Sequence, residues 1–267
     1  AKIPAWGRIW MALLGLHPWE AIHAIVPELW LLPKSSPAHP RRLYCHMRLI
    51  YLGLSYLRAT KLTAPKTAVV EDIREELFPG GYDPRAFNPD EVAPSDLYED
   101  PGLLLRGASR LLGLADRISP KRLRKKALAT AIDHMLFELH STDYVCLSPV
   151  NGMLFCLALH HQNPPHPELD QALAGLEYWV WEDDQEGMRI AGARSDIWDT
   201  GFLLQALAEG PASPSAHTIS KAARAWLAAA QQTQDIPDGR AYYREPARGG
   251  WGFADEDHPW PVSDCTA

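Results

Sequence analysis

The stretch Lys221-Ala222-Ala223-Arg224-Ala225-Trp226-Leu227 is followed by Gln231 and, later in the chain, by Gly249-Gly250-Trp251-Gly252-Phe253. The first part has the composition of a helix, and Gln231 lies five residues after Trp226. A Gln side chain can hydrogen-bond the unpaired amides at the start of a neighbouring helix, and an indole ring can cover that contact. The pattern therefore predicts that adjacent helices are stapled together here. A plain helix followed by a glycine-rich turn is the alternative.

Helical periodicity dominates the rest of the chain, and no region alternates between apolar and polar residues for long. In residues 66–78, for example, Val69, Ile73 and Leu77 share one face of a helix. We predict an all-α fold of paired helices packed as antiparallel hairpins. The predicted helices span residues 10–16, 19–32, 43–62, 66–78, 101–115, 119–140, 149–162, 168–180, 195–209 and 215–233, with a loop at 79–101.

The composition is that of a globular protein and excludes several function classes. The 267 residues include 26 Lys and Arg against 33 Asp and Glu, a net charge of −7, which argues against a nucleic-acid binder. The four cysteines are too scattered for a disulfide framework and contain no Cys-x-x-Cys pair. This pattern excludes a finger-type zinc site and predicts a reducing compartment. The ten tryptophans indicate a use for large π faces.

The ends of the chain and its most apolar segment indicate whether it is part of a longer protein and whether it contacts a membrane. The chain starts with Ala1, without a signal peptide, and we expect it to be an internal piece of a longer protein. No apolar run reaches the roughly 18–20 residues that a spanning helix needs. The longest run spans residues 49–57 and is followed by the basic residues Arg58 and Lys61. We interpret it as a buried helix, with contact to one membrane leaflet as the alternative.

An acidic residue in apolar surroundings lies near the C-terminal end, in Trp260-Pro261-Val262-Ser263-Asp264-Cys265-Thr266-Ala267. Desolvation of the Asp264 carboxyl would favour its neutral, proton-donating form, and Cys265 could hydrogen-bond to it. The local chemistry alone favours another role, in which Ser263 or Asp264 caps a following helix.

A set of short segments, in order along the whole chain, carries a resemblance to a known family: Pro4-Ala5-Trp6-Gly7, Pro18-Trp19-Glu20, Pro27-Glu28-Leu29-Trp30-Leu31, Pro37-Ala38-His39-Pro40, Tyr44-Cys45-His46, Ser195-Asp196-Ile197-Trp198-Asp199-Thr200 and Val262-Ser263-Asp264-Cys265-Thr266-Ala267. Together with residues 221–251, which resemble a repeat of Gln and Trp, they are similar to the oxidosqualene cyclases, a group of class II triterpene cyclases.

The resemblance implies a fold of two α/α toroids, both incomplete in this chain. Residues 1–182 would be the second toroid domain, truncated at its N-terminus. Residues 183–267 would be the start of the catalytic toroid, truncated at the acid motif. The implied activity is an isomerase reaction that needs no cofactor and no metal. The implied partners are 2,3-oxidosqualene and a membrane surface on the cytoplasmic side. We expect the piece alone to be inactive.

The resemblance also implies roles for individual residues. Asp264 matches the acid that protonates the epoxide, and Cys265 matches the neighbour that hydrogen-bonds to it. Trp198 and Phe253 match aromatic residues that face developing carbocations, which a ring quadrupole stabilises without acting as a base. The remaining substrate-binding matches are His46, Tyr44, Trp6, Val150 and Val262. Two of the matched cavity positions depart from animal relatives, because Tyr44 replaces a Trp and Met47 replaces a Cys.

Within the family that this chain resembles, the residues around the acid differ between enzymes that act on different substrates or form different products. Squalene–hopene cyclases carry an Asp-rich version, because protonating an alkene needs a stronger acid, whereas Asp264 stands alone between Val262-Ser263 and Cys265. The single-Asp form therefore resembles the epoxide-opening branch. Val262 resembles the lanosterol-type choice, and Ile is typical of cycloartenol-type enzymes. The segment Gly192-Ala193-Arg194-Ser195 lacks the Tyr of the cycloartenol-type pattern.

Competing interpretations concern metals and binding. Asp183-Asp184-Gln185-Glu186 faintly resembles an acidic Mg²⁺ motif, but it has no partner motif and fits a solvated loop better. His160, His161 and His166 are separated by prolines, so we interpret them as part of a loop. A zinc protein prenyltransferase β-subunit is the runner-up toroid, but its Asp and Cys are separated by one residue. A helical interaction module without enzymatic activity is the other alternative.

Overall fold

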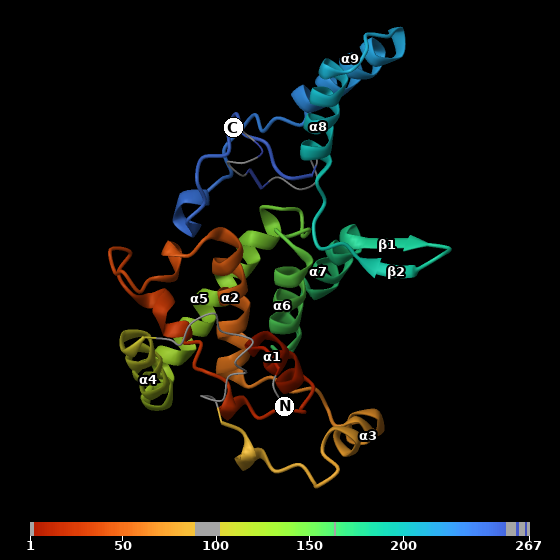
Figure 1. Ribbon diagram of the computed structural model, residues 1–267. Helices are drawn as coiled ribbons and strands as arrows, with labels where there is room; N and C mark the ends of the chain where they lie inside the picture. The colour runs from red at the N-terminus through yellow and green to blue at the C-terminus, as the bar shows by residue number, and fades with distance from the viewer. Residues whose placement is uncertain (1–2, 89–101, 163, 255–259, 262–264, 266–267) are drawn as a thin grey trace. The chain divides into compact units, whose positions relative to one another are not determined.

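A computed structural model describes residues 3–88, 102–162, 164–254, 260–261 and 265 (Figure 1). Helices make up most of the described chain. They are α1 (Ala5–Leu13), α2 (Cys45–Thr60), α3 (Ala68–Leu77), α4 (Leu103–Ile118), α5 (Lys121–His140), α6 (Pro149–His160), α7 (Leu169–Gly175), α8 (Asp196–Glu209) and α9 (Pro214–Ala229), with the two strands β1 (Val180–Asp183) and β2 (Gly187–Ile190).

The chain divides into two compact units. The first comprises Ala1–Pro40 and Leu54–Thr130, and the second comprises Arg41–Gly53 and Ala131–Ala267. The predicted domain boundary between residues 182 and 183 stays a prediction.

In the first unit, the core forms around the residues that follow α1. The indole of Trp19 is buried, and its Nε1 donates a hydrogen bond to the carbonyl of Leu62 at 2.9 Å. The amide of Ala64 donates to the carbonyl of Leu13 at 2.7 Å, so the chain after α2 runs beside the end of α1. A buried carbonyl without a partner costs free energy, and both contacts avoid that cost.

The helix predicted over residues 19–32 is not present. The structure has two 3-10 helices there, Trp19–Ala21 and Pro27–Leu31. Pro27 has no N–H to donate, and the residue before a proline is driven to extended conformations. Val26 accordingly has φ −92° and ψ 112°. The segment still turns its apolar side chains inward, since Trp19, Val26 and Trp30 are all buried.

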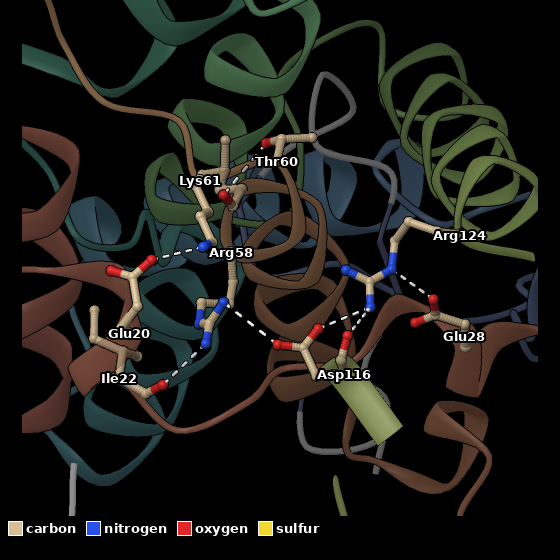
Figure 2. Close-up of polar contacts among 9 residues, drawn as sticks. Glu20, Ile22, Glu28, Arg58, Thr60, Lys61, Asp116 and Arg124 are labelled. Carbon is tan, nitrogen blue, oxygen red and sulfur yellow. Dashed lines mark hydrogen bonds and ion pairs between the residues drawn. The ribbon is translucent and has the colours of Figure 1, made fainter. Parts of the chain in front are cut away.

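An ionic network holds this irregular segment against three helices (Figure 2). Asp116 of α4 accepts a hydrogen bond from Arg124 Nη2 of α5 at 2.8 Å, and its other carboxylate oxygen lies 3.5 Å from Arg58 Nη1 of α2. Arg58 also donates to the carbonyl of Ile22 at 3.3 Å. Arg124 Nε donates to Glu28 Oε1 at 2.5 Å. Each arginine therefore links Asp116 to a different part of the segment.

The same network decides between the two interpretations of residues 49–57. Leu49, Leu52 and Leu57 are fully buried, and Arg58 pairs with Asp116 instead of facing a headgroup. Lys61 lies at the surface, where it pairs with Glu20 at 2.6 Å. The segment is a buried part of α2, which confirms the favoured interpretation.

In the second unit, close packing of helices fixes the core. A Cβ atom added to Gly53 of α2 would lie 2.6 Å from the Cβ of Leu154 of α6, so the two helices touch where the glycine has no side chain. Trp179 is fully buried, and its Nε1 donates to the carbonyl of Val145 at 2.8 Å. The indole thus secures the chain immediately before β1.

The all-α prediction is wrong at one place. β1 and β2 form an antiparallel hairpin in which Val180 pairs with Ile190 and Asp183 pairs with Gly187. The acidic segment that we interpreted as a loop is its turn, in which the Asp183 carboxylate accepts hydrogen bonds from the amides of Gln185 and Glu186. Only four residues form each strand, too few for an alternating pattern to be visible in the sequence.

Gln231 and Trp251 form a staple, but not the predicted one between adjacent helices. Gln231 Nε2 donates to the carbonyl of Gly249 at 2.8 Å, and Trp251 Nε1 donates to the carbonyl of Leu227 at 2.7 Å. Leu227 lies in the last turn of α9, where carbonyls have no helical partner. The staple therefore joins a glycine-rich turn to the end of its own preceding helix, which packs against α8.

The helix predicted over residues 10–16 begins earlier, at Ala5, and ends at Leu13. The later helix predictions hold better. Helices α4 to α9 begin within two residues of the predicted positions. The helix predicted over residues 168–180 ends at Gly175, because the chain tightens into a 3-10 turn at Leu176–Trp179 before β1.

We predict that Asp116→Asn lowers the free energy of unfolding of the 267-residue chain by roughly 1.5–3 kcal/mol, because it weakens two charge-assisted contacts in a largely buried position. The urea midpoint of the helical circular dichroism signal measures this change.

Glu20→Gln is the matched control, because it neutralises a carboxylate whose lysine partner is exposed. It should lower the free energy of unfolding by less than about 1 kcal/mol. Equal effects of the two variants would contradict the role given to Asp116.

Candidate functional site

Two of the predicted substrate-facing aromatics lie together in the second unit. The ring centroids of Trp198 on α8 and Phe253 are 4.9 Å apart, and their planes are inclined by 51°. Phe202, one turn further along α8, adds a third ring whose centroid is 6.2 Å from that of Trp198. Trp198 and Phe253 are each half-buried, so part of their surface remains open to a ligand.

Backbone contacts fix this aromatic pair. The amide of Ile197 donates to the carbonyl of Phe253 at 3.2 Å, so the loop residue is held at the first turn of α8. The staple fixes the loop from the other side, because Trp251 is bonded to the end of α9. Phe253 is therefore held between a helix start and a helix end, although it belongs to no regular element itself.

The residues at the start of α2 form a second aromatic pair. The rings of Tyr44 and His46 stack with centroids 5.3 Å apart and planes inclined by 20°. The Sγ of Cys45 lies 3.6 Å from His46 Nδ1. Burial raises the pKa of the Cys45 thiol, which keeps it neutral. Tyr44 and Met47 are exposed, so this end of α2 offers both an aromatic and a thioether surface.

The other predicted site residues are placed separately or fall outside the described residues. Trp6 of α1 belongs to the first unit, where its ring and that of Trp10 form a T-shaped pair with centroids 5.4 Å apart. Val150 lies half-buried in the first turn of α6, and Cys265 is half-buried. Val262 and Asp264 lie outside the described residues. The four cysteines are all described, and none forms a disulfide.

The second unit contains a buried ionic cluster that was not predicted from the sequence. Glu138 of α5 is 1% exposed, and its Oε2 accepts a hydrogen bond from Arg244 Nη1 at 2.8 Å. Its Oε1 lies 3.2 Å from His134 Nε2, one turn earlier on α5. Burial lowers the pKa of the Arg244 guanidinium, and the Glu138 carboxylate opposes that shift. The one available signal was a lone acid within the apolar run 135–139.

The described residues bear on two further questions, whether a metal site is present and whether a helix could cross a membrane. Within the described ranges, no three His, Cys, Asp or Glu side chains are grouped so as to hold a metal ion. Asp183, from the faint Mg²⁺ motif, is paired with Arg189 across the hairpin. Among the described helices, none combines the length and the apolar character that crossing a membrane requires.

Comparison with known proteins agrees with the resemblance found in the sequence. Residues 1–185 match the family described as the squalene-hopene cyclase N-terminal domain. The chain is 32% identical to a cycloartenol synthase of Dictyostelium discoideum and 32% identical to a lanosterol synthase of Homo sapiens. It is 30% identical to an alpha-onocerin synthase of Lycopodium clavatum.

Each of these three alignments covers 99% of the chain, and the covered shares of the relatives are 38%, 37% and 36%. The chain thus spans little more than a third of the length of these curated relatives. The family match, by contrast, extends over more than half of the chain. The chain therefore belongs to the squalene-hopene cyclase N-terminal domain family, and its predicted resemblance to oxidosqualene cyclases is confirmed.

Proposed function

We propose that the gene product containing this chain cyclises 2,3-oxidosqualene to a tetracyclic sterol precursor, with Asp264 as the acid. The observation that carries the proposal is the contact between Trp198 and Phe253, two aromatic rings that a backbone hydrogen bond and the staple hold together. We also propose that the helices belong to two α/α toroids divided between residues 182 and 183.

The proposed chemistry begins with proton transfer from the Asp264 carboxyl to the epoxide oxygen. The carbon–oxygen bond opens, and the resulting cation is attacked in turn by the double bonds of the folded chain. Aromatic faces lower the energy of such cations electrostatically and offer no lone pair that would capture them. Loss of one proton at the end restores neutrality, so the reaction is an isomerisation and requires no oxidant or reductant.

We propose lanosterol as the product, and this part of the proposal depends on Val262. The three relatives reported above carry names of different products, so the family match alone does not choose between them. A side chain two residues before the acid can shift how the final cation sits relative to the base. A difference of one methylene in such a pocket is worth about 1–3 kcal/mol.

A squalene–hopene type of reaction is the alternative within the family. It would require protonation of an alkene, which needs a stronger acid than epoxide opening does. The sequence Val262-Ser263-Asp264-Cys265 contains a single carboxyl group, which favours the epoxide. Offering the enzyme both substrates distinguishes the two reactions.

We further propose that helix α4 contacts a lipid surface, from which such an apolar substrate would enter. Its outer face is apolar and exposed: Leu104, Leu111 and Ile118 recur every seven residues, and Leu104 is 92% exposed. Arg110 and Arg117 are exposed on the same helix, where they can meet anionic headgroups. A helix with an apolar face flanked by basic residues is typical of interfacial binding. This helix replaces residues 49–57 as the candidate, because those residues are largely buried.

We predict that Asp264→Asn lowers kcat for 2,3-oxidosqualene at least about 100-fold in the full-length gene product, because an amide cannot supply the proton. Cys265→Ala should slow the reaction less. Sterol formation from labelled 2,3-oxidosqualene and from squalene provides the measurement.

Asp183→Asn serves as the control, because it makes the same change in the turn of the β hairpin and should leave kcat unaltered. Near-normal turnover by the Asp264→Asn enzyme, or turnover of squalene but not of the epoxide, would overturn the assignment.

We predict that Val262→Ile raises the share of minor sterols, cyclopropyl products among them, since the larger side chain moves the final cation relative to the base. Mass spectrometry of the extracted sterols measures the distribution. A cyclopropyl sterol as the main product of the unaltered enzyme would contradict the lanosterol proposal.

We predict that Leu111→Glu with Ile118→Glu reduces co-sedimentation of the full-length gene product with vesicles of phosphatidylcholine and phosphatidylserine, because both changes place charge on the apolar face of α4. Val69→Glu is the control, since Val69 is a comparably exposed apolar residue on α3. Unchanged sedimentation of the α4 variant, or an equal loss with Val69→Glu, would exclude this face as the docking surface.

A further inference from the structure

The chain before the proposed acid is attached to helix α5 by three consecutive side chains. Tyr242 stacks on Phe137 with ring centroids 4.0 Å apart and planes inclined by 7°. The hydroxyl of Tyr242 donates to Asp133 Oδ2 at 2.9 Å. The ring of Tyr243 lies against His134, with centroids 5.8 Å apart. Arg244, the third of these residues, is paired with Glu138. All three therefore dock on two turns of α5.

Arg244 also reaches forward along the chain. The Cζ of its guanidinium lies 3.3 Å from the ring centroid of Trp260, and both side chains are buried. The same guanidinium group thus donates to a carboxylate at its edge and stacks on an indole with its face. Only a planar cation can do both, since a lysine ammonium has no flat face to stack.

Trp260 stands immediately before Pro261 and four residues before Asp264. A proline restricts the backbone torsion φ, so the placement of Trp260 also constrains the course of the chain at Pro261. The described attachment therefore runs from α5 through Arg244 to Trp260.

We propose that Arg244 is a positioning residue for the cyclisation: it anchors Trp260 to Glu138 of α5 and thereby fixes the start of the acid-bearing segment. The proposal rests on the function proposed above, in which Asp264 is the acid. It goes beyond that function because it assigns a role to Arg244, a residue that the proposed chemistry does not itself use.

A buried ion pair alone is weak support for a functional role, because an apolar pair of similar volume is often equally stable. That property offers a way to separate positioning from stability. Arg244→Met alone removes the ion-pair partner of the buried Glu138 carboxylate, which should destabilise the fold. Arg244→Met with Glu138→Met removes both charges, and should recover most of the lost thermal stability without restoring the contact between guanidinium and indole.

The experiment compares the full-length gene product with Arg244→Met, Arg244→Lys and the Arg244→Met with Glu138→Met double variant, measuring Tm, kcat and KM for 2,3-oxidosqualene. We expect the double variant to regain Tm but to keep a kcat about 100-fold below the unaltered enzyme, with KM little changed, as follows when a reacting group is misplaced. Arg244→Lys keeps the ion pair without the stacked face, and should recover only part of kcat. Trp260→Leu should lower kcat similarly.

Arg58→Met is the matched control, because it removes a buried arginine from the ionic network of the first unit; it should lower Tm and leave kcat unchanged below its melting temperature. Recovery of kcat together with Tm in the double variant would overturn the proposal and reduce Arg244 to a structural role. Asp264→Asn, measured alongside, keeps the two proposals apart: if it stays active, the acid assignment fails, whatever Arg244 does.

Discussion

A buried carbonyl group must find a donor, and in this chain tryptophan indoles supply that donor at the points where helices give way to irregular chain. Trp19 bonds Leu62 after α2, Trp179 bonds Val145 after α5, and Trp251 bonds the last turn of α9. Each indole also contributes a large apolar ring to its surroundings. A single indole thus hydrogen-bonds a carbonyl at or just after a helix end and also packs against its surroundings.

The same constraint holds Phe253, a residue of the proposed site, in a loop whose backbone is fixed. Phe253 has no regular structure around it, yet the bond from Ile197 and the indole of Trp251 hold it from two sides. Reacting cations need aromatic faces at fixed positions, because an electrostatic contribution from a displaced ring falls off quickly. Rigid attachment of irregular chain suits a reaction in which the protein must guide intermediates without bonding to them.

Sequence periodicity located most helices, because one apolar face every 3.6 residues is a local signal. It failed at residues 19–32, where Pro27 interrupts the hydrogen bonds while the apolar side chains continue, and at the hairpin, whose strands are too short to show alternation. Family resemblance singled out Trp198 and Phe253 individually, and the structure shows that their rings are in contact. The ion pair of Glu138 and Arg244 could not be predicted from the sequence, since no local pattern connects residues separated by 106 positions.

The indole contacts also restrict how this sequence can drift. A tryptophan that both fills space and donates a hydrogen bond has no substitute among the other amino acids, because phenylalanine lacks the donor and histidine is too small. Substitutions at Trp19, Trp179 and Trp251 would therefore lose either the size of the ring or its hydrogen-bond donor. We expect positions of this kind to be retained when surface and core aliphatic residues are exchanged, so they would mark the ancestry of a chain after most of its overall identity is gone.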